Sequence, residues 1–253
     1  MILAVDIGNS NITIGLFEND SIVHKTHITS DINTSDDEYK KMLLSFIANK
    51  DIDAVIVASV VEELNDRFCL FIEELLGIEP VFISPSINMN IKIKLKNNNE
   101  IGADRIVNGS IGYELYHKPI IIVDCGTATT FDIINSNGEY IGGIILPGIK
   151  TQLKTLHKST SKLPLIEIED IEKFIGNDTK SAILSGIING NASLIDGMIQ
   201  KCISELKETP ALIATGGLSR FITKYTTTKF DLIDENLTLK GINYLYKINS
   251  KVE

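Results

Sequence analysis

Two aspartates interrupt apolar segments that otherwise have the pattern of buried strands: Asp6 in ILAVDIGNSN and Asp124 in IIIVDCGTAT. A buried carboxylate is costly unless it is paired, hydrogen-bonded or bound to a cation. In both segments a glycine follows two residues later, and small polar residues complete a turn. Such a turn can bring backbone N–H groups against phosphate oxygens while the aspartate holds a cation or its hydration water. Each segment alone is equally typical of an ordinary hairpin turn.

A third segment, ALIATGGLSR (211–220), carries two adjacent glycines directly after an apolar strand pattern. Gly216 and Gly217 would allow close approach of a base or a ribose and would direct a helix N-terminus toward phosphate. The ordinary alternative is a tight connection from a strand to a helix. The sequence contains no G-x-x-x-x-G-K-[ST] motif, so this chemistry would differ from that of a Walker loop.

The elements needed to position these residues occur twice along the chain. Hydrophobic periodicity predicts strands at 2–5, 12–17, 21–28, 54–61 and 80–84, and helices at 35–48 and 64–76. The second half starts again with a strand pattern at 120–134, followed by strands at 139–148 and 211–215 and a long helix at 177–206. We interpret this as a duplicated α/β domain with a cleft between the copies; chance similarity of short Asp-Gly segments is the alternative.

The net charge and the cysteine content indicate which partners and which cellular compartment to expect. The 253 residues carry a formal net charge of −9, which argues against nucleic acid or an anionic membrane as the main partner. Cys69, Cys125 and Cys202 are far apart and form no C-x-x-C pair, so neither a disulfide framework nor a zinc site is expected. No secretory signal is visible, and no apolar run approaches the roughly 18 residues of a membrane span. We therefore expect a cytoplasmic protein.

Five segments together resemble the type III pantothenate kinases of the acetate and sugar kinase/actin superfamily. They are DIGNSN (6–11), EIGADRIVNG (100–109), VDCGTATTFD (123–132), GGIILPG (142–148) and IGNDTKSAILSG (175–186). The resemblance extends from Met1 to about Tyr246. It implies an α/β fold of duplicated ribonuclease H-like (actin-like ATPase) domains with a central cleft, which we expect at 1–117 and 118–253, with the last helix able to pack back on the first domain.

The resemblance also implies an activity: ATP-dependent phosphorylation of pantothenate to 4'-phosphopantothenate, the first step of coenzyme A biosynthesis. Asp104 would be the general base for the pantothenate hydroxyl, because an alcohol attacking a γ-phosphoryl group needs a nearby proton acceptor. Gly102, Ala103, Arg105 and Thr179 would bind the substrate. Without the family motif, Asp104 and Arg105 would be read as a surface ion pair and Thr179 as a hydroxyl at a helix end.

The remaining implied roles concern ATP, cations and assembly. Asp124 would bind potassium or ammonium, and Asp6 would act indirectly on Mg²⁺. The enzyme would be a homodimer. The implied ATP-binding residues are Asp6, Ile7, Gly8, Asn9, Ser10, Asn11, Ile12, Thr13, Thr127, Gly216 and Gly217.

One segment departs from the family pattern, and two lysine patterns need interpretation. Leu95 stands where a tyrosine is expected, and Asn98 where a proline is expected, which removes one substrate contact and weakens the rigidity of that loop. Lys92, Lys94 and Lys96 alternate with apolar residues, which indicates a strand with one solvated face. The series Lys150, Lys154, Lys158 and Lys162 would line one helix face, either as a solvated surface or as an anion-binding one. The histidines His24, His27, His117 and His157 receive no role.

Two other functions fit the same fold. One is a non-catalytic regulator of the Bvg accessory factor type, although the presence of Asp6, Asp104 and Asp124 argues against an inactive scaffold. The other is a different enzyme of the superfamily, either a sugar kinase or a polyphosphate phosphatase. Thr179 and the Gly-Ala-Asp-Arg segment favour pantothenate over both.

Overall fold

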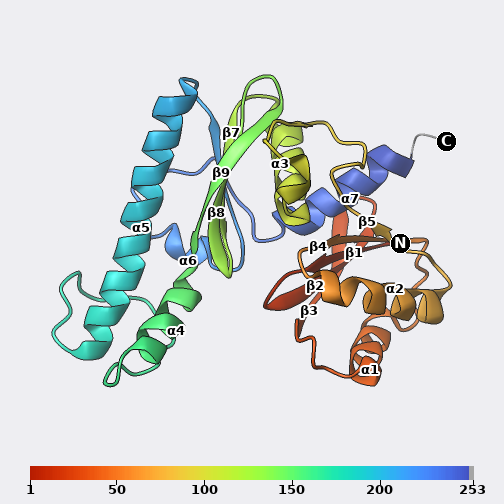
Figure 1. Cartoon of the computed structure of the whole chain (residues 1–253), viewed down its shortest axis with the longest axis horizontal. Helices are drawn as coiled ribbons and strands as arrows, with labels where there is room; N and C mark the ends of the chain where they lie inside the picture. Colours follow the sequence, from red (N-terminus) through yellow and green to blue (C-terminus); the bar gives the residue numbers. More distant parts are fainter. Residues whose placement is uncertain (251–253) are drawn as a thin grey trace. The chain divides into compact units, whose positions relative to one another are not determined.

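The computed structural model describes residues 1–250, which form two compact units (Figure 1). Unit 1 consists of residues 1–111 together with the C-terminal segment that begins at Leu237, and unit 2 consists of residues 112–236. The chain therefore enters unit 2 within a helix, whereas the expected domain boundary lies just beyond that helix, between residues 117 and 118.

Unit 1 contains a five-stranded sheet with the order β3-β2-β1-β4-β5. Its strands are β1 (Ile2–Ile7), β2 (Asn11–Glu18), β3 (Ser21–Thr29), β4 (Ala54–Ser59) and β5 (Val81–Phe82). The helices of this unit are α1 (Asp36–Ile47), α2 (Glu62–Leu76), the first part of α3 (Ala103–Tyr116) and α7 (Leu237–Ser250). Two short elements, β6 (Lys92–Ile93) and the 3₁₀ helix η1 (Asn98–Glu100), precede α3.

Unit 2 repeats this arrangement in the strand order β9-β8-β7-β10-β11, which is part of a six-stranded sheet. Its strands are β7 (Ile120–Cys125), β8 (Ala128–Ile134), β9 (Glu139–Pro147), β10 (Ala211–Thr215) and β11 (Leu232–Ile233). Its helices are the end of α3, α4 (Ile149–Ser159), α5 (Thr179–Leu206) and α6 (Ser219–Ile222).

Five strands of each sheet match in order. In each, the first strand runs antiparallel to the second and parallel to the strand that follows the hairpins, as β1 does with β2 and β4, and β7 with β8 and β10. The second hairpin is irregular at a similar place in both copies, between Leu16 and Phe17 and between Ile133 and Ile134. The predicted α/β class is confirmed, and the shared order supports duplication.

The two faces of β1 and β2 have different coverings. Alternate residues such as Leu3, Val5 and Ile14 are fully buried in an apolar cluster with α1 and α2. On the opposite face Gly15 has no side chain, and a Cβ atom there would lie 2.9 Å from Cδ1 of Leu239 in α7. The C-terminal helix therefore packs directly on the first sheet.

Several predicted elements differ in extent from the observed ones. The strand expected at 80–84 is only Val81–Phe82, and the alternating lysine segment contributes only Lys92–Ile93 as strand. Lys150, Lys154 and Lys158 are exposed along α4, but this helix ends at Ser159, so the expectation that Lys162 shares its face is wrong. Short apolar runs mark where a strand lies more reliably than how far its hydrogen bonding continues.

The expectation that no segment approaches a membrane span in length and apolar character also needs correction. Among residues 1–250, α5 is long and apolar enough to cross a membrane by length and composition alone. However, 44% of its most apolar 18-residue window is buried within the structure. Leu184, Ile188 and Ile195 of this helix lie in the apolar cluster of unit 2, which accounts for the composition.

Two helical glycines provide a test of the packing of α7 in unit 1. At Gly241 a Cβ would lie 2.6 Å from Cγ1 and 2.8 Å from the carbonyl oxygen of Val107 in α3. Substitution Gly241→Ala should therefore lower the free energy of unfolding by about 1–3 kcal/mol despite the higher helix propensity of alanine. Urea denaturation followed by circular dichroism measures this change.

The matched control is Gly197→Ala in α5, where no atom lies within 4 Å of the added Cβ. That substitution should leave stability unchanged or raise it by up to about 1 kcal/mol. A Gly241→Ala protein as stable as the Gly197→Ala protein would contradict the close packing of α7 on α3.

Candidate active site

The first loop connects β1 to β2 and begins just after Asp6. The Gly8 N–H donates to the Asn11 carbonyl at 3.0 Å, which closes the turn. The Ser30 N–H donates to the Ser10 carbonyl at 3.1 Å, so the end of β3 holds the loop from the side. Asp6 is half-buried and lies opposite Thr13 in the hairpin.

The implied ATP-binding residues of this loop contribute in different ways. Ile7 and Ile12 are buried in the apolar cluster of unit 1, on the face opposite Asp6 and Thr13. Their side chains therefore belong to the core, and only their backbone groups can serve the loop. Asn9, Ser10 and Asn11 are exposed and keep polar side chains at the turn.

The second loop connects β7 to β8 in the same way and is one residue shorter. Here the Gly126 N–H donates to the Ala128 carbonyl at 3.0 Å. The Thr127 carbonyl accepts from the Gly148 N–H at 3.0 Å and from the Thr151 hydroxyl at 2.7 Å. The beginning of α4 thus braces this loop through its backbone. Gly148 is the last residue of the segment GGIILPG (142–148), whereas no pattern in the sequence indicates the contact that Thr151 makes.

The third loop packs directly on the second. Gly216 has φ +87, and a Cβ there would overlap Oδ1 of Asp124 and lie 2.7 Å from the Cys125 nitrogen. The Leu218 N–H also donates to the Cys125 carbonyl at 3.2 Å. Only glycine can therefore occupy position 216 without moving the carboxylate. Gly217 has no atom within 4 Å of its would-be Cβ, so this edge of the loop is open.

Asp104 lies in the first turn of α3, at the carboxyl end of β1 and β4. A Cβ at Gly102 would lie 2.5 Å from Oδ1 of Asp104 and 3.4 Å from Cγ1 of Val60. Val60 in turn donates its N–H to the Ile7 carbonyl at 3.0 Å. Gly102 is thus the small residue that lets the Asp104 carboxylate approach the end of the sheet.

Burial is the main influence on the acidity of Asp104. It raises the pKa of this carboxyl group, and the N–H and positive charge of Arg105 oppose the rise. The Arg105 N–H donates to Oδ1 of Asp104 at 2.8 Å, which also orients the carboxylate. A carboxylate with a raised pKa is a stronger proton acceptor, as general base catalysis requires.

Thr179 is the first residue of α5 and is exposed. It does not cap the helix: Asp178 is the N-cap, its carboxylate accepts from the Ser181 N–H at 2.9 Å, and Ser181 completes a capping box. These hydrogen bonds lower the pKa of Asp178. Because other residues satisfy the helix end, capping does not explain the Thr179 hydroxyl.

The loop before Gly102 lacks the expected proline but is held by side chains. The Asn97 side chain accepts from the Asn99 N–H at 3.2 Å and donates to Glu100 at 2.9 Å. These bonds give the segment local order that a proline would otherwise supply. Leu95 is half-buried, and nothing in the structure shows a replacement for the hydroxyl of the expected tyrosine.

The predicted site residues fall into two groups. Unit 1 holds Asp6, the first loop and 102–105, and the carboxyl ends of β1 and β4 bring them to one edge of its sheet. Unit 2 holds Asp124, Thr127, Thr179 and Gly216–Gly217, of which the structure brings Asp124 and Gly216 into contact.

Cation binding can be assessed from the donor groups. Within residues 1–250, no cluster of three or more His, Cys, Asp or Glu side chains could hold a metal by itself. A cation here would therefore be shared with ligand oxygens or backbone carbonyls. The Asp124 carboxylate, whose Oδ1 lies where a Cβ at position 216 would stand, supplies the kind of oxygen that hard cations prefer. Asp6, half-buried in β1 just before the first loop, supplies a carboxylate oxygen of the same kind.

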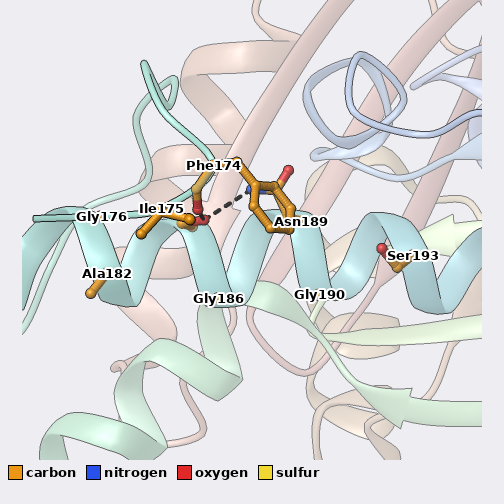
Figure 2. A pocket seen from close by; sticks show the side chains of 9 residues that line it. Phe174, Ile175, Gly176, Ala182, Gly186, Asn189, Gly190 and Ser193 are labelled. Atoms are coloured by element: carbon orange, nitrogen blue, oxygen red, sulfur yellow. Dashed lines mark hydrogen bonds between the residues drawn. The ribbon is translucent and has the colours of Figure 1, made fainter.

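A separate groove runs along α5 in unit 2 (Figure 2). It has a volume of about 500 Å³, and Gly186 and Gly190 form part of its floor. Phe174 and Ile175 lie at its side and are 75% and 81% exposed.

Comparison with known proteins identifies the family. The model for "Type III pantothenate kinase" matches residues 2–201. A type III pantothenate kinase of Geotalea uraniireducens is 38% identical over 254 aligned positions, covering 98% of this chain and 99% of the relative. One from Halalkalibacterium halodurans is 37% identical and covers 98% and 100%.

Solved structures agree on the fold. A Baf family protein from Campylobacter jejuni has a TM-score of 0.62 at 21% identity and covers 99% of this chain and 100% of its own. MreB 5 of Spiroplasma citri has a TM-score of 0.54 at 11% identity, covering 99% and 97%. These likenesses establish the actin-like architecture alone, while the sequence relatives and the motif residues on the two sheets assign the lineage: the chain belongs to the type III pantothenate kinase family.

Proposed function

We propose that this protein transfers the γ-phosphoryl group of ATP to the hydroxyl of pantothenate, forming 4'-phosphopantothenate for coenzyme A biosynthesis. Its family membership supports the reaction, and the position of Asp104 is the observation that carries the mechanism. The carboxylate lies at the edge of the sheet that also bears the first loop, is oriented by the Arg105 N–H, and is made more basic by burial. We expect the enzyme to act in the cytoplasm.

In this mechanism Asp104 accepts the hydroxyl proton as the pantothenate oxygen attacks the γ-phosphorus. The bond from the γ-phosphorus to the bridging oxygen breaks, and ADP leaves with that oxygen. Phosphoryl transfer depends mainly on positioning and charge stabilisation, so the protein supplies no covalent nucleophile. Gly102, Ala103, Arg105 and Thr179 are proposed to bind pantothenate.

Binding of ATP is assigned to the three loops. Backbone groups of the first loop, together with Thr13 and Thr127, are proposed to contact the phosphates, and Gly216 and Gly217 the adenosine. Asp6 would hold Mg²⁺ through water, and Asp124 would bind potassium or ammonium. When bound, these cations supply positive charge that offsets the negative charge of the phosphates.

The groove along α5 is proposed to bind a second copy of the chain. Gly186 and Gly190 have no atom within 4 Å of a would-be Cβ, so another backbone can approach closely there. Phe174 and Ile175 would leave water on association. The resemblance to homodimeric kinases favours a second copy as the occupant.

The general base is tested with Asp104→Asn. The amide cannot accept the proton, so kcat should fall by about 10²- to 10⁴-fold while the thermal unfolding temperature stays near that of the parent. A coupled assay for ADP release that depends on added pantothenate measures this. The parent should also lose activity on acidification at a higher pH than an exposed aspartate would give, because burial raises the pKa of Asp104.

The control is Asp37→Asn, an exposed carboxylate in the first turn of α1 that should leave kcat unchanged. Full turnover by Asp104→Asn would reject the base assignment. A parent protein that binds ATP but releases no ADP with pantothenate would instead favour a sugar kinase or a regulator.

The cation role of Asp124 is tested by salt dependence. Potassium or ammonium should stimulate the parent several-fold over sodium at equal ionic strength, because the site would select one size of cation. Asp124→Asn should abolish the difference between the salts. Equal rates of the parent in all three chlorides would remove the assignment.

The dimer is tested by the double substitution of Phe174 and Ile175 to aspartate. Two charges on each copy should prevent burial of this surface and convert the protein to monomers, as measured by sedimentation velocity. Phe174→Leu with Ile175→Val, which keeps the surface apolar, serves as the control. A parent that sediments as a monomer at micromolar concentration would contradict the proposal.

A further inference from the structure

Three polar side chains form a row across the first sheet of unit 1. Asp6 on β1 lies directly opposite Thr13 on β2, and Thr13 lies directly opposite His27 on β3. Residues paired in this way point to the same face of a sheet. This is the face opposite the α1–α2 cluster, since the neighbouring residues Ile12 and Ile14 are buried in that cluster.

A hydrogen bond joins two members of the row. The Thr13 Oγ1 and His27 Nδ1 atoms are 3.1 Å apart. Partial burial and the nearby charge of Lys25 lower the pKa of His27, which favours a neutral imidazole at neutral pH. A hydroxyl has one proton and two lone pairs. The hydrogen bond to His27 uses one of these positions and so restricts the directions in which the Thr13 hydroxyl can bond to another group.

The residue directly after β3 holds the first loop at a second point. The Ser30 N–H, three residues after His27, donates to the Ser10 carbonyl at 3.1 Å. Ser30, just beyond β3, therefore contacts the backbone of the turn, and His27 within β3 contacts the side chain of Thr13, the last residue of the implied ATP segment 8–13. Together they link the geometry of the loop to β3.

Unit 2 lacks this arrangement, although its sheet has the same order. Asp124 lies opposite Thr130, and Thr130 lies opposite Ile145. Ile145 has no polar atom in its side chain and is 64% exposed. The imidazole is thus a feature of the first sheet and is not required by the duplicated fold.

We propose that His27 is a positioning residue for ATP, which orients the Thr13 hydroxyl beside Asp6 so that the first loop presents it to the nucleotide phosphates. This inference rests on the proposed function, because it takes the first loop as the phosphate site. His27 acts through Thr13 and touches no reacting atom itself.

The test compares ATP binding by His27→Leu, His27→Asn and Thr13→Val, measured by calorimetry with Mg²⁺ and without pantothenate. Loss of one orienting hydrogen bond should raise the Kd for ATP by about three- to tenfold in His27→Leu. The asparagine side chain can place a hydrogen-bonding group near the former Nδ1, so His27→Asn should recover most of the affinity. In steady-state assays the KM for ATP should rise while the KM for pantothenate stays constant.

A double-mutant cycle separates positioning from general support of the sheet. In the Thr13→Val background, His27→Leu should add little further loss, since its partner is already gone. The matched control is His24→Leu on the same strand; His24 pairs with Leu16, a residue of the α1–α2 face, and should leave ATP affinity unchanged. Thermal unfolding of each variant verifies folding.

Four results would overturn the inference: parental ATP affinity in His27→Leu, equal loss in the leucine and asparagine variants, additive losses with Thr13→Val, or an equal rise in both KM values. The test of the proposed reaction is distinguishable from the test of His27. A parent that binds ATP without phosphorylating pantothenate would refute the proposed function, whereas a parent active on pantothenate with unaffected His27→Leu would refute only this inference.

Discussion

The contact between Gly216 and the Asp124 carboxylate is the constraint on which the candidate nucleotide site depends. A carboxylate at the end of a buried strand has to find polar partners without an adjacent side chain crowding it. The parallel pairing of β7 and β10 brings residue 216 against it, and only the absence of a Cβ allows both to remain. Unit 1 solves a related problem with Gly102, whose missing side chain leaves room for Asp104.

These two glycines show how the repeated fold serves two different tasks. In each unit the parallel partner of the first strand ends at the same edge as an aspartate, through β4 in one and β10 in the other. In unit 1 that edge also bears the first turn of α3, which carries the proposed base. Unit 2 follows β10 with Gly216, which packs on Asp124, and with Gly217, whose open side suits a flat ligand. Duplication therefore supplied the shared sheet, and the segments at its edge, which differ between the two units, supplied the chemistry.

The sequence predicted the parts of this arrangement that depend on local pattern. The β-branched runs located β1, β4, β7 and β10, and the Asp-Gly spacing located both hairpin loops, because strand alternation and turn chemistry act over a few residues. The contact of Gly216 with Asp124, the bracing of Thr127 by Thr151 and the bond from His27 to Thr13 were not predictable in this way. Each joins residues distant in sequence, and pairing register rather than composition decides it. For the same reason the sequence pattern assigns no role to His27.

The return of α7 to the first sheet has a consequence for synthesis of the protein. Gly15 lies under Leu239, so one face of the first hairpin is covered by a segment made more than two hundred residues later. Unit 2 is continuous in sequence and can complete its core on the ribosome. Unit 1 has to wait, with one side of its sheet uncovered, until α7 has been synthesised. Its exposure to chaperones and proteases in that interval is set by the length of the inserted unit and by the elongation rate.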